Sequence, residues 1–140
     1  MTCAARGPML VVDASCLVEV VTATPRADQV RAILREDEEQ AAPHLIDAEV
    51  LGVIRKHHEL GRIDDTAADQ AVMDLRDWPG ERFGHRSLLG RAWQLRATVR
   101  SSDALYVALA EALDAPLLTA DARLADAPGP RCEIRLAPRP

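Results

Sequence analysis

The amino-acid sequence predicts an α/β fold with a mostly parallel central sheet flanked by helices. Two short apolar runs, residues 9–12 and 117–120, each stop at an aspartate. A run of this length followed by helix-forming sequence is typical of a strand buried on both faces of a parallel sheet. Short strands and helices alternate along the rest of the chain without a repeat, and this alternation favours parallel strand pairing.

The length predicts a single domain. A chain of 140 residues is long enough to bury about 68% of its unfolded surface, and no linker-like segment divides it. We expect residues 1–8 to be a disordered extension, residues 9–137 to form the domain and residues 138–140 to be a tail. Met9 stands directly before the first strand and is an alternative start to Met1.

The composition predicts a cytoplasmic protein. No apolar run approaches the roughly 20 residues needed to span a bilayer, and the first eight residues carry no secretory signal. The three cysteines include no C-x-x-C pair, which argues against a disulfide framework and a structural zinc site. A reducing cytoplasm fits this pattern best.

The first strand is followed by two predicted helices. Asp13 or Ser15 can cap the first helix, which runs through Val21 and is broken before Pro25. Pro25 can open the second helix. Its apolar stripe consists of Val30, Ile33 and Leu34. We expect this helix to finish in the acidic run 36–39, as a solvated end.

Two longer helices are predicted next. The first covers residues 45–60 and carries Glu49 on its apolar side. The apolar residues on that side are Ile46, Val50, Val53 and Ile54. The second covers residues 66–78, with Asp64 or Asp65 as its cap. Its inward residues are expected to be Ala68, Val72 and Leu75.

The second half of the chain continues the alternation. We expect a short strand at 81–83, helices at 87–99 and 103–113, and strands at 117–121 and 132–136. The buried stripe of the 87–99 helix is expected to be Leu88, Leu89, Ala92 and Leu95. The cations expected to point outward are Arg91, Arg96 and Arg100.

Four carboxylates in this pattern predict a metal site. Asp13 and Asp121 follow the two clear strands, and the carboxyl ends of parallel strands form the ligand-binding edge of such a sheet. Glu49 and Asp103 lie among apolar neighbours on predicted helices. Acids gathered at one edge raise one another's pKa and resist ionising together unless divalent cations compensate their charge.

Each carboxylate has a structural alternative when it is taken alone. Asp13 and Asp121 could be helix caps or turn residues only. Glu49 could pair with an arginine, and Asp103 could lie favourably in the first turn of a helix. The joint occurrence of the four acids favours the metal site.

The net charge does not exclude an RNA ligand. The formal charge is −5 and the pI about 5.3, the wrong sign for a protein that binds nucleic acid through a general basic surface. The four acids supply −4 of this −5, so a metal site would leave the remainder nearly balanced. Apart from Lys56, every lysine or arginine position is an arginine, which suits bidentate phosphate contacts but is also what high-GC codon bias produces.

Other side chains with potential chemistry are predicted to be structural. His57 and His58 point about 100° apart on a helix, so we expect solvated surface there instead of a shared metal. Cys16, Trp78 and Trp93 are expected in the core.

Four segments together resemble the PIN-domain family. They are V-V-D-A-S at 11–15, P-H-L-x-x-x-E at 43–49, S-D-A-L-Y-V-A-L-A-E at 102–111 and L-L-T-A-D at 117–121. Their order and domain-scale spacings make the combination a strong signal. The size and the third segment are most similar to VapC-type toxins, the ribonuclease halves of bacterial toxin–antitoxin pairs. Ser102 departs from the pattern, because relatives often carry tyrosine there.

The resemblance implies a PIN-like three-layer fold and metal-dependent endoribonuclease activity. The family's acidic positions, which bind Mg²⁺ or Mn²⁺, correspond to Asp13, Glu49, Asp103 and Asp121. Its supporting hydroxyls correspond to Ser15 and Thr119. The resemblance also implies an RNA substrate hydrolysed by metal-activated water, a small cognate antitoxin that covers a groove, and a homodimer.

Two other functions are compatible with the sequence. A receiver-like phosphoacceptor domain also places acids around Mg²⁺ at strand ends, but it uses a lysine after a late strand, and Lys56 lies instead on the predicted Glu49 helix. A non-catalytic binding module would keep the acidic pocket, with or without a structural metal, and use an apolar groove to hold a partner.

Overall fold

The computed structural model describes residues 8–35 and 39–138. These residues form a five-stranded sheet with the order β3-β2-β1-β4-β5, in which every neighbouring pair is parallel. The strands are β1 (Met9–Val12), β2 (Glu39–Pro43), β3 (Glu81–Phe83), β4 (Leu117–Thr119) and β5 (Ile134–Leu136). The predicted parallel sheet is confirmed. The expectations for residues 1–7, 36–38 and 139–140 lie outside the described residues.

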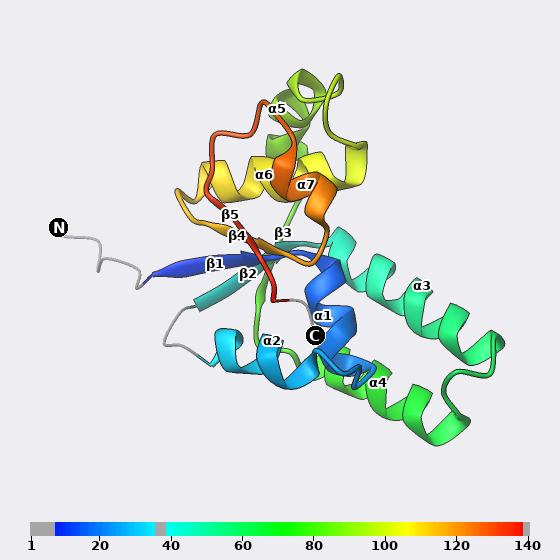
Figure 1. Ribbon diagram of the computed structural model, residues 1–140. Helices are drawn as coiled ribbons and strands as arrows, with labels where there is room; N and C mark the ends of the chain where they lie inside the picture. Colours follow the sequence, from blue (N-terminus) through cyan, green and yellow to red (C-terminus); the bar gives the residue numbers. More distant parts are fainter. Residues whose placement is uncertain (1–7, 36–38, 139–140) are drawn as a thin grey trace, which may run out of the picture.

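Helices cover both faces of the sheet, which confirms the expected three-layer α/β fold (Figure 1). One layer consists of α1 (Ala14–Val21), α2 (Ala27–Leu34), α3 (Leu45–Glu59) and α4 (Asp65–Asp77). The other consists of the 3-10 turn η1 (Arg86–Leu88), α5 (Leu89–Gln94), α6 (Ser101–Ala112) and α7 (Ala122–Asp126). From β1 the chain adds β2 and β3 on one side of that strand, and then returns to add β4 and β5 on its other side. Because crossovers between parallel strands are right-handed, crossovers that run in opposite directions along the sheet place their helices on opposite faces.

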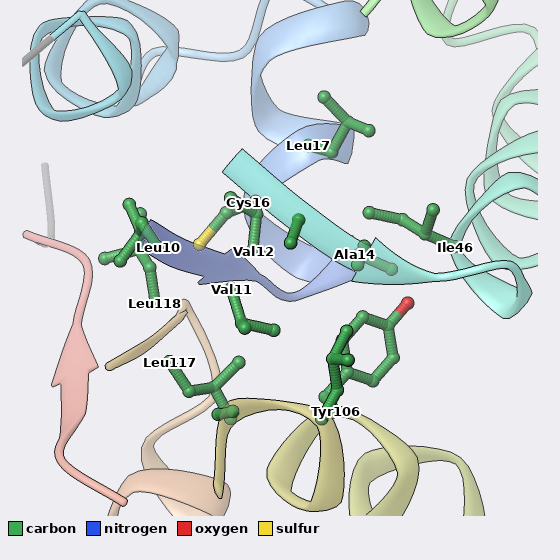
Figure 2. Packing of buried hydrophobic residues seen from close by; sticks show 14 of the residues in the cluster. Leu10, Val11, Val12, Ala14, Cys16, Leu17, Ile46, Tyr106, Leu117 and Leu118 are labelled. Carbon is green, nitrogen blue, oxygen red and sulfur yellow. The ribbon is translucent and has the colours of Figure 1, made fainter. Parts of the chain in front are cut away.

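The core lies on both sides of the central strand β1. Its residues Leu10, Val11 and Val12 have no exposed surface. Figure 2 shows Val11 pointing toward the side of Tyr106 and Leu117, while helix α1 lies on the opposite side of the strand. Burial on both faces explains why β1 is continuously apolar instead of alternating, as the sequence predicted.

Strand β2 was not predicted. The sequence places a solvated helix end at residues 36–39, whereas Glu39 begins β2 and pairs with Met9. The strand lacks β-branched and aromatic residues, so its composition gives little strand signal. Ala41 and Ala42 are fully buried, and pairing with β1, which is distant in sequence, determines the conformation of this segment.

The predicted helix at 87–99 is wrong in its extent. Helix α5 ends at Gln94 and is followed by turns, and Gly90 within it weakens the helical preference by about 1 kcal/mol relative to alanine. Leu88 and Leu95 are buried as expected, but Leu89 is 56% exposed. Because the helix breaks, the spacing that predicted one continuous apolar face does not apply.

The structure also settles several single-residue predictions. Cys16 and Trp78 are core residues as expected, whereas Trp93 is 68% exposed and Val72 is 39% exposed, contrary to expectation. Ala71 takes the inward position that was assigned to Val72. In the described part of the chain, no helix is long and apolar enough to cross a membrane.

Candidate functional site

The predicted site residues gather where the sheet changes direction. Strand β1 pairs with β2 on one side and with β4 on the other, and ligands of open α/β sheets bind outside the strand ends at such a switch point. Asp13 follows β1 and precedes α1, while Thr119 ends β4 and Asp121 precedes α7. The strand ends therefore place three predicted side chains at one crevice.

Asp13 is the most deeply buried acid of the site, with only 5% of its surface exposed. The Ser15 hydroxyl donates to its Oδ2 at 2.7 Å, and the Thr119 hydroxyl donates to the same atom at 2.8 Å. Burial raises the pKa of Asp13 and the charge of Asp103 adds to the rise, while the two hydroxyls oppose it. The predicted supporting role of Ser15 and Thr119 thus has a direct geometric basis.

Glu49 reaches the same region from helix α3. The hydroxyl of Tyr106, a fully buried residue of α6, donates to Glu49 Oε1 at 2.8 Å. Burial raises the pKa of Glu49, the Tyr106 hydrogen bond lowers it, and the charges of Asp13 and Asp103 raise it further. Three of the four predicted acids therefore interact electrostatically.

Asp103 and Asp121 share a cation from the chain itself. Arg100 Nε donates to Asp103 Oδ2 at 3.3 Å, and Arg100 Nη2 lies 4.0 Å from Asp121 Oδ2. The three side chains line a cavity of about 160 Å³ together with Leu124 and Arg123. A guanidinium that bridges two carboxylates occupies the position of compensating charge that the sequence assigned to a metal ion.

Asp121 also has the structural role that was considered for it. Its Oδ1 accepts a hydrogen bond from the amide of Arg123 at 2.9 Å and so caps α7. Asp13 stands at the corresponding position of α1, but its side chain makes no capping hydrogen bond there. Helix capping therefore explains one carboxylate oxygen of Asp121, but it does not explain the presence of Asp13.

The four acids share one edge of the sheet without forming a closed cluster. In residues 8–35 and 39–138, no group of three or more His, Cys, Asp or Glu side chains stands at metal-binding spacing. The donors are nonetheless all carboxylate oxygens, the ligands preferred by Mg²⁺ and Mn²⁺. Burial first, and neighbouring acids second, raise the pKa values of Asp13 and Glu49, and a bound divalent cation would favour their charged forms. The donor set therefore fits such a metal.

Sequence reasoning missed two residues of the site. Arg100 was placed among outward cations, although its spacing of three residues from Asp103 on a helix was a usable signal. Tyr106 appeared in a motif but received no role, because its partner Glu49 is 57 residues away. By contrast, His58 pairs with Asp65 on the exposed surface, as predicted for a solvated histidine.

Comparison with known proteins places the chain in a family. The PIN-domain family model matches residues 10–130. Ribonuclease VapC1 of Mycobacterium tuberculosis is 42% identical over 127 residues, which are 90% of this chain and 96% of that protein. Ribonuclease VapC3 of the same species is 43% identical over 119 residues, covering 84% of this chain and 86% of that protein.

Solved structures agree on the fold. VapBC2 from Rickettsia felis, solved with a DNA fragment from its promoter, matches with a TM-score of 0.67 and 15% identity over 93% of this chain and 99% of that chain. VapC20 of Mycobacterium tuberculosis, a sarcin-ricin loop cleaving toxin, matches with a TM-score of 0.66 and 14% identity over 83% of this chain and 92% of that chain. With its sheet order, its acidic edge and these relatives, the chain belongs to the PIN-domain family and, within it, to the VapC proteins.

Proposed function

We propose that this chain is a divalent-metal-dependent endoribonuclease that acts as the toxin of a toxin–antitoxin pair. The observation that carries the proposal is the buried Asp13, held by two hydroxyls and coupled to Glu49 and Asp103 at the switch point of the sheet. The names of its relatives, which are ribonucleases, support the choice of substrate. The family assignment favours this hypothesis over a receiver-like phosphoacceptor.

The metal would be held by Asp13, Glu49, Asp103 and Asp121. A bound Mg²⁺ or Mn²⁺ supplies a Lewis acid and a water of lowered pKa. The chain's own contribution is to fix the ligands. Ser15 and Thr119 orient Asp13, and Tyr106 orients Glu49. Fixed orientation of ligands by neighbouring hydrogen bonds is typically worth 10–100-fold in metal affinity or activity.

Arg100 gives the site a contact for the RNA backbone. Its side chain is 75% exposed at the mouth of the acidic cavity. Once a divalent cation compensates Asp103 and Asp121, the guanidinium is free to donate to phosphate oxygens, for which its planar fork is well suited. Arg100 would thereby help to position the scissile phosphodiester at the acids.

A small antitoxin and a second copy of the chain are the proposed protein partners. The first is supported by the VapC relatives and by the VapBC2 neighbour. The product of a neighbouring gene should form a complex with the chain and inhibit it, and failure of any such product to bind counts against this partner. Light scattering on the free protein tests the homodimer, which a monomer at high concentration refutes.

Metal-dependent cleavage of RNA tests the catalytic proposal. Purified cellular RNA is incubated with the partner-free protein in Mg²⁺ or Mn²⁺, beside an EDTA control. The test variant is the double substitution Asp13→Asn and Asp103→Asn. The matched control is Asp69→Asn, which makes the same change on the exposed surface of α4.

Discrete products that require metal, persist in Asp69→Asn and vanish in the folded double variant support the nuclease, and their ends locate the scissile phosphate. If RNA from several sources stays intact while the folded protein binds metal, the nuclease proposal fails. A non-catalytic binding module then becomes the better explanation of the acidic edge.

A further inference from the structure

An exposed aromatic surface lies beside the candidate site. Trp93 and Leu89 of α5 are 68% and 56% exposed. They line a hollow of about 320 Å³ whose other lining residues are Ala92, Arg96, Ser101 and Leu105. The sequence predicted both residues in the core, so their exposure is not explained by packing within the described fold.

The cation beside this surface is available to an external anion. The guanidinium of Arg96 lies 4.5 Å from the centre of the Trp93 ring, and its Nη1 donates to the Trp93 carbonyl at 2.9 Å. In the described residues, no carboxylate lies within ion-pairing distance of Arg96. Arg91 of α5 is different, because Glu111 neutralises it.

Helix α6 joins this surface to the acidic cavity. Ser101 and Leu105 line the hollow, while Arg100 and Asp103 line the acidic cavity. The two features therefore flank the first turn of α6, and the diameter of one helix, roughly 10 Å, separates them.

We propose that Trp93 and Arg96 form a stacking platform for a base of the single-stranded RNA substrate, close to the scissile phosphate. This inference rests on the proposed nuclease function and adds a subsite to it. An exposed aromatic ring with an adjacent arginine is the combination that single-stranded nucleic acids use, since every base has a π-face and every linkage a negative charge. A second protein molecule could also cover the apolar ring, but it would have to supply a carboxylate to pair with Arg96.

Tryptophan fluorescence provides a direct test in the absence of catalysis. The chain has two tryptophans, and Trp78 is 8% exposed, so a stacked base should quench Trp93 selectively. Wild-type protein is titrated in EDTA with a single-stranded RNA decamer of random sequence. Trp93→Leu keeps an apolar side chain but removes the aromatic face. Met73→Ala, an exposed apolar site on α4, is the matched control.

The expected result is quenching in the wild type and in Met73→Ala, and RNA binding about 10-fold weaker in Trp93→Leu, the loss typical of one base–aromatic stack. An abasic decamer should bind both proteins equally. Equal RNA affinity of wild type and Trp93→Leu, or absence of quenching, overturns the platform. Light scattering that shows a dimer lost in Trp93→Leu also overturns it and assigns the surface to contact between copies.

The two proposals can fail separately. Quenching that persists in EDTA, with no cleavage of any RNA in metal, refutes the nuclease and leaves the platform as an RNA-binding site. Metal-dependent cleavage with unchanged rate and affinity in Trp93→Leu refutes the platform and leaves the nuclease.

Discussion

Two partly buried glutamates on opposite layers of the fold have opposite electrostatic environments. Glu111 of α6 accepts two hydrogen bonds from Arg91, at 2.7 and 3.2 Å, and one from the amide of Arg131 at 2.9 Å. Burial alone would raise the pKa of Glu111, but these donors outweigh it and the pKa is lowered. Glu49 of α3 has the Tyr106 hydroxyl as its donor and other acids as neighbours, and its pKa is raised.

The difference separates a structural carboxylate from one that we propose is functional. At Glu111 the chain supplies the compensating cation, so the ion pair is complete in the folded protein. At Glu49 the charge of Arg100 lowers the pKa but does not outweigh burial and the neighbouring acids, a balance that is typical of groups arranged for an external ligand. The same residue type therefore forms a complete ion pair in one layer, whereas in the other layer it is the residue that we propose binds a metal.

Substituting Glu49 should produce the largest effect. Glu49→Gln keeps the volume of the side chain and removes a proposed metal ligand. We expect metal-dependent RNA cleavage to fall by at least about 100-fold, the upper limit for changes in groups that only support a ligand. The thermal unfolding temperature in EDTA should not fall, because a buried charge with a raised pKa is removed. Cleavage assays measure the loss of activity, and calorimetric Mn²⁺ titration measures the loss of metal affinity. Full activity in Glu49→Gln would exclude Glu49 from the site.

The same substitution at Glu111 should act on stability instead. Glu111→Gln leaves Arg91 partly buried without its carboxylate, and we expect unfolding to cost about 2 kcal/mol less. The lowered pKa of Glu111 means that its contribution is present at neutral pH and is lost as the pH falls through the carboxylate range. Urea unfolding at pH 7 and pH 4 should therefore show a penalty that shrinks at low pH. Cleavage per folded molecule should be unchanged.

Tyr106→Phe sharpens the comparison by removing the one hydroxyl that supports Glu49. Because the Tyr106 hydrogen bond lowers the pKa of Glu49, its loss should raise that pKa further. The acid limb of the pH–rate profile should then move to higher pH, so that cleavage is about 10-fold slower on the acid limb and close to wild type on the plateau above it. A loss of the same size at every pH would indicate that Tyr106 has only a packing role.

The sequence predicted the parts of this arrangement that depend on local pattern. The buried strands β1 and β4 were recognisable because each is a short apolar run that stops at Asp13 or near Asp121. Glu49 was found because a charged residue interrupts the apolar side of a long helix. Strand β2 was missed because its pairing with β1 is non-local and its residues carry no strand preference.

The features missed at the site have the same origin. Trp93 was expected in the core from its residue type alone, whereas its exposure of 68% depends on how the short helix α5 lies on the rest of the fold. The Arg100–Asp121 ion pair and the Tyr106–Glu49 hydrogen bond join side chains from elements that are distant in the sequence. Periodicity predicts which residues share a face of one helix or strand, but it does not predict which residues of different elements come into contact.

The smallest predicted effect concerns the stability of the metal-free protein. Asp13 has a pKa raised above its ordinary value of 3.8, chiefly by burial, so the folded state binds this proton more tightly than the unfolded state. Stability is then greatest below pH 3.8 for this group and falls as the pH rises through the raised pKa. Asn at this position cannot ionise. Asp13→Asn should therefore match the wild type at low pH and exceed it by about 1 kcal/mol at neutral pH in EDTA, a gain typical when a functional group is removed.

Saturating Mg²⁺ should reverse this order, because a ligand that binds only the folded state stabilises the wild type and not the variant. Urea unfolding across pH, with and without metal, measures both effects. If Asp13→Asn is less stable than the wild type in EDTA at neutral pH, the Asp13 carboxylate is a structural group like Glu111. The proposed distinction between a carboxylate whose charge is compensated by the chain and one whose charge is compensated by a metal would then fail at Asp13, the most deeply buried acid of the site.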